Sequence, residues 1–459
     1  MTERLEQQRG PATHRSRHTH HTRRTVLAVG AALGGGTLTT PLAACAGAGP
    51  AAAPERAQTA ESGEVEWSQW GSNADYAIAQ AQVDAFNATS PKIRVRANLL
   101  PGNYLEKLQA IVSAGTPPDV QHHNSGQFEA LAAKKAFGDL DPLIKRDKYR
   151  LEDLYPAFQD GVKFGGKFFA LPTTGANILL FYNKSLFDKA GRKYPSPEWT
   201  WRELEEAARA LTSPAGSADQ SWGFYVRNSI SNWASTIWQN GGEIWNADMS
   251  KCLINEPAAV EALEFFYGLK TKHNASPPPD VLTGLGGERG AFMAGKLAIN
   301  PTGAHQRFEY VAIDGFQWDL QVLQRGKKRT NILFTDMEAL DVAAKRPEGA
   351  WAFLKWLAAD QGQQIRAEKV RAIPSSRKYV ETEAFRNNPS GKNNKAIADD
   401  MPSGRVPPNA NSLFFELNER WNPELLALYN GTKSAKAAAD AMAEQTNALL
   451  KATGGRALR

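Results

Sequence analysis

Tryptophan residues beside amide-bearing residues are the part of this sequence with the clearest chemical meaning. Trp occurs 12 times, and several copies lie next to Asn, Gln or Gly at expected element ends, as in SQWGSN, SNWAS and IWQNGG. An indole covers the flat C–H face of a sugar ring, while amide and carboxylate groups bond the hydroxyls at its rim. Trp70, Trp233 and Trp238 are therefore candidates for a sugar-binding site, and core packing is the alternative for each of them.

Two further groups of residues suggest chemistry less strongly. Asp336, Glu338 and Asp341 lie close together, and a carbohydrate-active enzyme needs two positioned carboxylates. Their spacing does not place them across a glycosidic bond, so an enzyme remains only the alternative. The stretch GLGGERG at 284–290 lacks the Lys-Ser/Thr ending of a phosphate-binding loop and predicts a flexible loop. We therefore expect no catalytic residue and no cofactor.

The first 44 residues have the pattern of an export signal. A basic start is followed by the short, weakly apolar run VLAVGAALGGGTLTTPL and by the small residues of LAAC. A membrane-spanning helix is the alternative, but the run is short and is broken by Gly, Thr and Pro. The pair Arg23-Arg24 resembles a twin-arginine signal, with the general export route left open. LAAC resembles a bacterial lipobox, which predicts lipid attachment at Cys45 after cleavage.

Removal of this signal changes what the composition implies. The 54 basic and 48 acidic residues become 48 and 46, so the net charge falls from +6 to +2 and gives no case for nucleic-acid binding. The HTHH tract at 18–21 is lost with the signal, and a lipidated Cys45 leaves Cys252 single, so no metal site is expected. Residues 45–64 have almost no large apolar side chain and predict a flexible linker. The chain would then be anchored to the outer face of the cell membrane by its lipid alone.

Strand and helix patterns alternate after this linker. VEWSQW and KIRVRANL are typical of strands, whereas 74–90 and 104–115 are typical of helices. This order predicts an α/β fold with a mainly parallel sheet and helices on both faces. The roughly 395 residues after 64 exceed one ordinary core and predict two lobes. The small residues of 172–177 are expected to form a crossing between the lobes.

Several segments, in this order along the chain, resemble one protein family. They include AFNATSPKIRV, YLEKLQAIVSAGTPPDV, GKFFALPTTGANILLFYNKSLFDKAG, AFMAGKLAI and EGAWAFLKWLAADQGQQ. The chain is similar in these segments to the family 1 extracellular solute-binding proteins of bacterial ABC importers, the group of maltose-binding protein. The resemblance covers nearly all of 65–385. It implies a two-lobed periplasmic-binding-protein-like fold of type II, with the ligand cleft between lobes joined by hinge crossings.

The resemblance also implies the lobe boundaries and a function. The N-terminal lobe would comprise 65–174 with 322–372, and the C-terminal lobe 175–321 with 373–459. The protein would be a monomeric lipoprotein that captures a mono- or oligosaccharide by hinge closure and delivers it to permease subunits. A binder of a phosphorylated sugar or another polar solute is one alternative, and a surface adhesin or sensor without a transporter is another.

Family position adds candidate ligand contacts at strand ends that face the cleft. These are Asn73, Tyr104, His123, Asn124, Thr174, Asn177, His305, Asp336 and Arg371. In NPTGAHQ, His305 stands where many relatives have Trp, and an imidazole covers less area than an indole. This departure argues against a long stacked maltodextrin-like ligand and leaves a smaller sugar open. A structural role is the alternative for His305, and Arg307 and Arg371 are the residues that would favour a phosphorylated sugar.

Overall fold

The computed structural model describes residues 63–71, 73–90, 92–217, 219–368, 372–388, 392–455 and 457, all within the compact unit Thr59–Arg459. The predicted export signal, Cys45, the linker up to residue 62, and Arg371 lie outside the described residues. None of the helices in the described ranges is long and apolar enough to cross a membrane.

The N-terminal part of the sheet forms as the alternating pattern predicts. Strands β1 (Gly63–Gln69), β2 (Ile93–Leu99) and β3 (Val120–Asn124) are parallel, with β1 between the other two. Helices α1 (Asn73–Thr89) and α2 (Tyr104–Ser113) are the connections between them. Val65 and Trp67 of β1 are fully buried, because helices cover the sheet on both faces. The carboxyl ends of these three strands therefore lie together at one edge.

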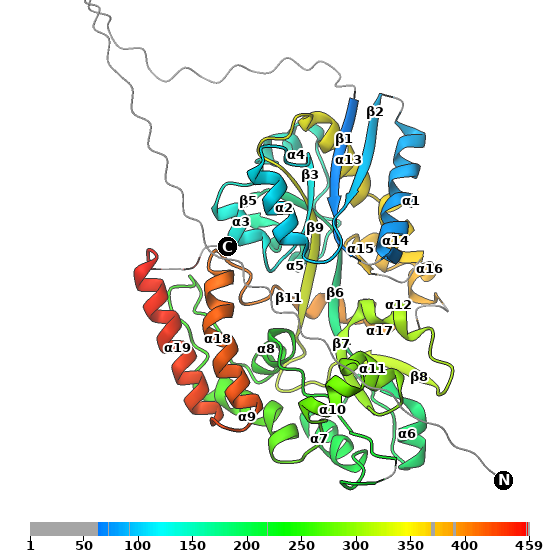
Figure 1. Cartoon of the computed structure of the whole chain (residues 1–459), viewed down its shortest axis with the longest axis vertical. Helices are drawn as coiled ribbons and strands as arrows, with labels where there is room; N and C mark the ends of the chain where they lie inside the picture. Colours follow the sequence, from blue (N-terminus) through cyan, green and yellow to red (C-terminus); the bar gives the residue numbers. More distant parts are fainter. Residues whose placement is uncertain are drawn as a thin grey trace, which may run out of the picture. The chain divides into compact units, whose positions relative to one another are not determined.

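Two long strands connect this part of the sheet to the rest of the chain. β6 (Ala170–Asn183) is buried along nearly its whole length and pairs antiparallel with β9 (Asn331–Leu340). At one end β9 also pairs with β3, whereas the other end of β6 pairs with β7 (Ile299–Gly303) and β8 (Trp318–Val322). Figure 1 shows β6 and β9 running between the elements around β1 and those around β7. The predicted crossing at 172–177 is thus the middle of a continuous strand.

The sheet is mixed, and the expectation of a mainly parallel sheet was wrong. The order is β10-β6-β9-β3-β1-β2, with β11, β7 and β8 attached at the side, and every pair that includes β6 is antiparallel. The reason is that the chain passes to the second lobe along β6 and returns along β9, so the two strands must run in opposite directions. The alternation of strands and helices along the sequence does not indicate that β9 runs antiparallel to β6.

The remaining elements complete the two lobes of this α/β fold. The larger helices are α7 (Trp201–Ala210), α8 (Ile230–Gln239), α9 (Pro257–Thr271), α13 (Pro347–Ala358), α14 (Asp360–Glu368), α18 (Phe414–Tyr429) and α19 (Ala435–Ala452). The shorter helices are α3 (Phe128–Ala133), α4 (Asp141–Asp147), α5 (Pro156–Asp160), α6 (Lys184–Lys189), α10 (Pro279–Gly284), α11 (Gly287–Met293), α12 (Arg307–Tyr310), α15 (Arg377–Val380), α16 (Glu383–Arg386) and α17 (Asn394–Asp400). The short strands β4 (Lys163–Phe164), β5 (Lys167–Phe168), β10 (Ile373–Pro374) and β11 (Gly404–Arg405), and the 3-10 turns η1 (Ala304–Gln306) and η3 (Met401–Ser403), lie between them.

Separate apolar clusters stabilise the two lobes. One contains Val65, Trp67 and Trp351 of β1 and α13. Another contains Trp233 and Trp421, from the packing of α8, α9, α18 and α19. A third cluster joins Phe158 of α5 to Phe181 and Ile397, and so combines residues of both predicted lobes. The predicted lobe boundaries therefore stay predictions.

Candidate functional site

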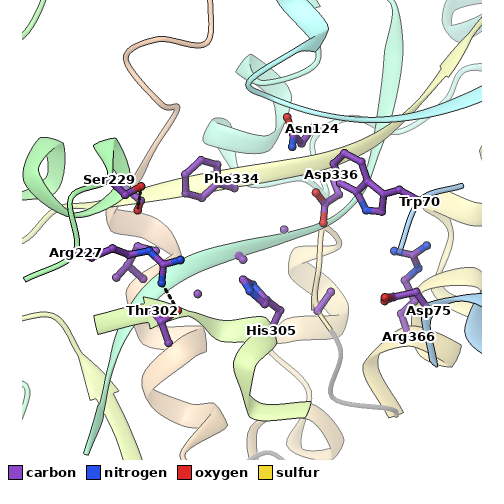
Figure 2. A pocket seen from close by; sticks show the side chains of 16 residues that line it. Trp70, Asp75, Asn124, Arg227, Ser229, Thr302, His305, Phe334, Asp336 and Arg366 are labelled. Carbon is purple, nitrogen blue, oxygen red and sulfur yellow. Dashed lines mark hydrogen bonds between the residues drawn. The ribbon is translucent and has the colours of Figure 1, made fainter. Parts of the chain in front are cut away.

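A cavity of about 400 Å³ lies against the middle of β6 and β9. Its floor is formed by Gly175, Ala176, Ile178, Phe334 and Asp336 of these two strands. One wall comes from the lobe of β1: Trp70, Asp75, Asn124, Arg366 and Ala372. The opposite wall comes from the lobe of β7: Arg227, Ser229, Ser231, Thr302, Gly303 and His305. Figure 2 shows Trp70 and Arg227 on opposite sides of the cavity, with Asp336 on the side of Trp70. We call this cavity the hinge cleft.

Trp70 is held in the first wall by a buried polar network. The residue follows the end of β1, and its ring lies edge-on to the rings of Tyr104 at 5.6 Å and His122 at 4.7 Å. His122 Nδ1 lies 2.7 Å from Glu338 Oε1, and Trp67 Nε1 donates to Glu338 Oε2 at 2.8 Å. Because these partners are buried and bonded, the indole has little freedom to turn, which is what a flat contact surface requires.

The floor presents hydrogen-bond acceptors. The pairing of β3 with β9 places Asn124 opposite Asp336. Thr174 Oγ1 donates to Asp336 Oδ2 at 3.4 Å, and Asn124 Oδ1 accepts from the backbone N–H of Gly126 at 3.0 Å. Burial raises the pKa of Asp336, because few groups replace the water that the carboxylate loses. Such a carboxylate gains from a ligand that donates hydroxyl protons to it.

The second wall combines one guanidinium with hydroxyl groups. Arg227 Nη1 donates to Thr302 Oγ1 at 3.1 Å and lies 2.8 Å from Glu288 Oε1 of α11. Ser229 and Ser231 follow Arg227 at alternate positions, and their hydroxyls lie 3.0 Å apart. His305 is exposed on the turn η1, directly after β7. This wall therefore offers both donors and acceptors to a polar guest.

Four of the predicted residues line the hinge cleft, namely Trp70, Asn124, His305 and Asp336. Two others, Tyr104 and Thr174, contact lining residues. Tyr104 lies beside Trp70 and exchanges a hydrogen bond with Ser68, while Thr174 contacts Asp336. His123 is fully buried against Phe137, and burial lowers its pKa to about 3, so it is a neutral core residue. Asn73 is exposed at the start of α1 and is absent from the lining.

The other predicted contacts in the described residues are absent from the lining of the hinge cleft. Asn177 is buried in β6 and donates from Nδ2 to Asp400 at 2.7 Å. Trp233 has no exposed surface and packs against Trp421, which corresponds to core packing, the alternative given above for this residue. Trp238 lines a second cavity of about 670 Å³, and the guanidinium of Arg405 lies over its ring.

Several lining residues were missed by sequence reasoning. Asp75, Arg227, Ser229, Ser231, Thr302, Phe334 and Arg366 all line the hinge cleft. Arg227 and Ser229 lie in an irregular segment and Ser231 lies on the first turn of α8, so no periodic pattern pointed to them. Arg307, named above only under the alternative of a phosphorylated sugar, is fully buried, and its Nε donates to the carbonyl of Ala304. The Arg307 side chain points into the protein interior and not into the hinge cleft.

The GLGGERG stretch was predicted as a flexible loop, and this prediction was wrong. The stretch contains the end of α10, a turn, and the first four residues of α11. Gly286 and Gly287 have φ of 77° and 81°, a conformation that costs glycine little. The pair thus connects two helices sharply and brings Glu288 onto the first turn of α11.

A cleft with walls from two α/β lobes and a floor of the two strands that join them defines a two-lobed binding protein. None of the described residues forms a group of three or more His, Cys, Asp or Glu able to hold a metal ion. The chain belongs to the bacterial extracellular solute-binding protein family, whose sequence profile matches residues 70–364.

Similar proteins carry names of binding proteins. A substrate-binding protein of an ABC transporter from Listeria monocytogenes, solved in complex with cycloalternan, is 26% identical with a TM-score of 0.76, covering 86% of this chain and 100% of that chain. The mannitol-binding protein of Pseudomonas aeruginosa is 27% identical over 56% of this chain and 58% of its own length. An sn-glycerol-3-phosphate-binding periplasmic protein of Agrobacterium fabrum is 25% identical over 40% of this chain and 42% of its own length. The chain thus spans about half the length of the curated relatives that it matches.

Proposed function

We propose that this protein is the substrate-binding component of an ABC importer and that it captures a carbohydrate in the hinge cleft. The observation that carries the proposal is the composition of the two facing walls. Trp70 supplies an aromatic surface on one side, and Arg227 with the hydroxyls of Ser229 and Thr302 supplies polar contacts on the other. A sugar has complementary surfaces, an apolar ring face and a polar rim.

Capture follows from contacts to both walls. A sugar stacked on Trp70 reaches Asp336 at the floor and the neighbouring Asn124 with its hydroxyls, and Arg227 on the far wall. A ligand that binds both lobes is held more tightly when the lobes approach each other, so it shifts the protein toward a closed form. The closed form is then the shape that permease subunits recognise.

The carboxylates of Asp336 and Glu338 on β9, and of Asp341 just after it, favour binding over hydrolysis. Glu338 accepts hydrogen bonds from Trp67 and Gln69 and lies against His122, so it is engaged beneath the cleft. Asp341 accepts from Gln121 Nε2 and from the backbone of Ala343. Of the three, only Asp336 lines the hinge cleft. A glycosidase needs a pair of carboxyl groups across the scissile bond, and this trio supplies one.

The location that we propose is the outer face of the cell membrane. The family is extracellular, and the lipobox-like LAAC makes Cys45 the point of lipid attachment after export, by the twin-arginine or the general route. A monomer on a short linker would then release its ligand to permease subunits in the same membrane.

A thermal-shift screen tests the proposed function. We expect one or a few mono- or disaccharides to raise the melting temperature of the wild-type chain without turnover. Trp70→Ala should abolish the shift, whereas Trp245→Ala, in the wall of the second cavity, should preserve it. Loss of the shift in Trp245→Ala alone would place the ligand in the second cavity and refute the assignment of the site.

A further inference from the structure

The guanidinium of Arg227 is the cation on the second wall of the hinge cleft, and it has an acidic partner. Arg227 Nη1 lies 2.8 Å from Glu288 Oε1, and the two side chains are 32% and 22% exposed. The same nitrogen donates to Thr302 Oγ1 at 3.1 Å. The pair is partly shielded from water, so each charge is largely compensated by the other.

The fold fixes Glu288 in this position. The Gly286–Gly287 turn starts α11 at once after α10, and Ala291 and Phe292 of α11 are fully buried. Phe292 packs on Tyr310 with ring centroids 4.7 Å apart. Because the helix is anchored by this packing, Glu288 on its first turn stays beside Arg227 rather than moving with a surface loop.

The other charged residues of the described lining add no net positive charge. Arg366 is the second guanidinium of the lining, and its Nε and Nη2 donate to the neutral amides of Gln82 and Gln69 at 3.3 Å. The lining contains two carboxylates as well, Asp75 and Asp336. With Glu288 behind Arg227, an anionic ligand finds no net positive charge among these residues.

We propose that Glu288 makes the hinge cleft selective for uncharged carbohydrates by neutralising Arg227, and so disfavours phosphate esters. This inference rests on the proposed function of the cleft as a carbohydrate site. A phosphate at the second wall would meet a guanidinium whose charge is already compensated by the carboxylate of Glu288, 2.8 Å behind it. The negative charge of that carboxylate would also repel the phosphate. A sugar hydroxyl meets no such repulsion and can bond Arg227 and Thr302.

The first test compares neutral and phosphorylated probes on the wild-type chain. The probe pairs are glucose with glucose 6-phosphate and mannitol with mannitol 1-phosphate, with sn-glycerol 3-phosphate and inorganic phosphate added alone. Using calorimetry and thermal shift, we expect each phosphorylated probe to bind at least about tenfold more weakly than a neutral sugar that binds. Tighter binding of a phosphate ester than of every neutral sugar overturns the inference, while the role as a solute receptor stands. If a wider neutral panel and the phosphate esters all fail to bind, the proposed function itself fails.

The second test removes the negative charge that is paired with Arg227. Glu288→Gln should increase affinity for the phosphorylated probes on the order of tenfold, because one charge-assisted hydrogen bond becomes available. Glu309→Gln is the matched control: it removes the same charge from the exposed pair with Arg289, at 2.6 Å, outside the cleft. Adding Arg227→Gln to Glu288→Gln should abolish the gain.

The outcomes separate local from general effects. A gain confined to Glu288→Gln supports the inference. An equal gain in Glu309→Gln attributes the change to net charge and overturns it, as does an unchanged phosphate affinity in a folded Glu288→Gln variant. Should Glu288→Gln fail to fold, the wild-type comparison of neutral and phosphorylated probes still decides the matter.

Discussion

Asn124 and Asp336 lie directly opposite each other in the antiparallel ladder of β3 and β9. The ladder joins the carboxyl end of a strand from one lobe to the strand that returns from the other, so two polar side chains meet where the lobes are connected. This placement follows from register alone, since both residues belong to regular strands.

Asp336→Asn should weaken ligand binding and stabilise the empty protein. Loss of a charge-assisted bond to a sugar hydroxyl lowers affinity by roughly ten- to a hundredfold. Because burial raises the pKa of Asp336 above its ordinary value of 3.8, the folded chain binds this proton more readily than the unfolded chain. Stability from this group is therefore greatest at low pH and falls as pH rises past 3.8. Asn removes that loss, so the free energy of unfolding of Asp336→Asn should exceed that of the wild type at neutral pH.

Urea unfolding of both forms across pH 4 to 8 measures this effect. Thr174→Val, which removes the donor to Asp336 but keeps the carboxylate, serves as the comparison. A variant Asp336→Asn that binds as tightly as the wild type would remove Asp336 from the list of ligand contacts.

His122→Ala should make the indole of Trp70 more mobile, because the His122 ring packs against it. The change removes the ring at 4.7 Å from the indole and leaves Glu338 Oε1 without its nearest partner. A buried carboxylate that loses a partner costs about 2–3 kcal/mol of unfolding free energy. Fluorescence of the chain should change as Trp70 becomes mobile, and affinity for the sugar should fall.

The exposed pair of Arg150 and Glu152 gives the control for this prediction. Their side chains are 69% and 67% exposed, so Glu152→Gln should leave the free energy of unfolding nearly unchanged. Equal stabilities for His122→Ala and Glu152→Gln would show that the buried network contributes nothing to the wall.

Asn177→Ala should reduce stability more than it reduces ligand affinity. Asp400 Oδ2 accepts from Asn177 Nδ2 at 2.7 Å and from Asn331 Nδ2 at 2.6 Å, and so ties β6 and β9 together below the cleft. Removing one donor from a buried carboxylate costs about 1–3 kcal/mol. Chemical denaturation and calorimetry on the same sample separate the two effects, and loss of binding at unchanged stability would make Asn177 a direct ligand contact.

Trp233→Ala and Trp233→Phe distinguish a core residue from a contact surface. The side chain is fully buried, so truncation to Ala should cost about 3–5 kcal/mol through the cavity it leaves. Phe keeps most of the packing against Trp421, and this variant should bind sugar like the wild type. If Trp233→Phe is stable but no longer binds, Trp233 acts on the ligand from within α8.

Local pattern predicted the elements of the first lobe because β1, α1, β2 and α2 each bury one regular set of side chains. The mixed sheet could not be read in this way, since the direction in which β9 returns depends on tertiary structure. The site shows the same division. Trp70 follows β1 and Asn124 ends β3, so both could be placed at the edge of the sheet. Trp233 and Trp238 are in one helix, and its packing is set by α9 and α18. Arg227 and Ser229 lie in an irregular segment that has no periodic signal.

The long strand β6 and its partner β9 are both the floor of the cleft and the link between the lobes. Under the proposed closure, groups on this axis move least and groups on the walls move most. Asp336 and Phe334 therefore present nearly the same surface to a ligand before and after the lobes approach each other. Trp70 and Arg227 on the walls move further. Their contacts with the ligand therefore determine how completely the two lobes close around it.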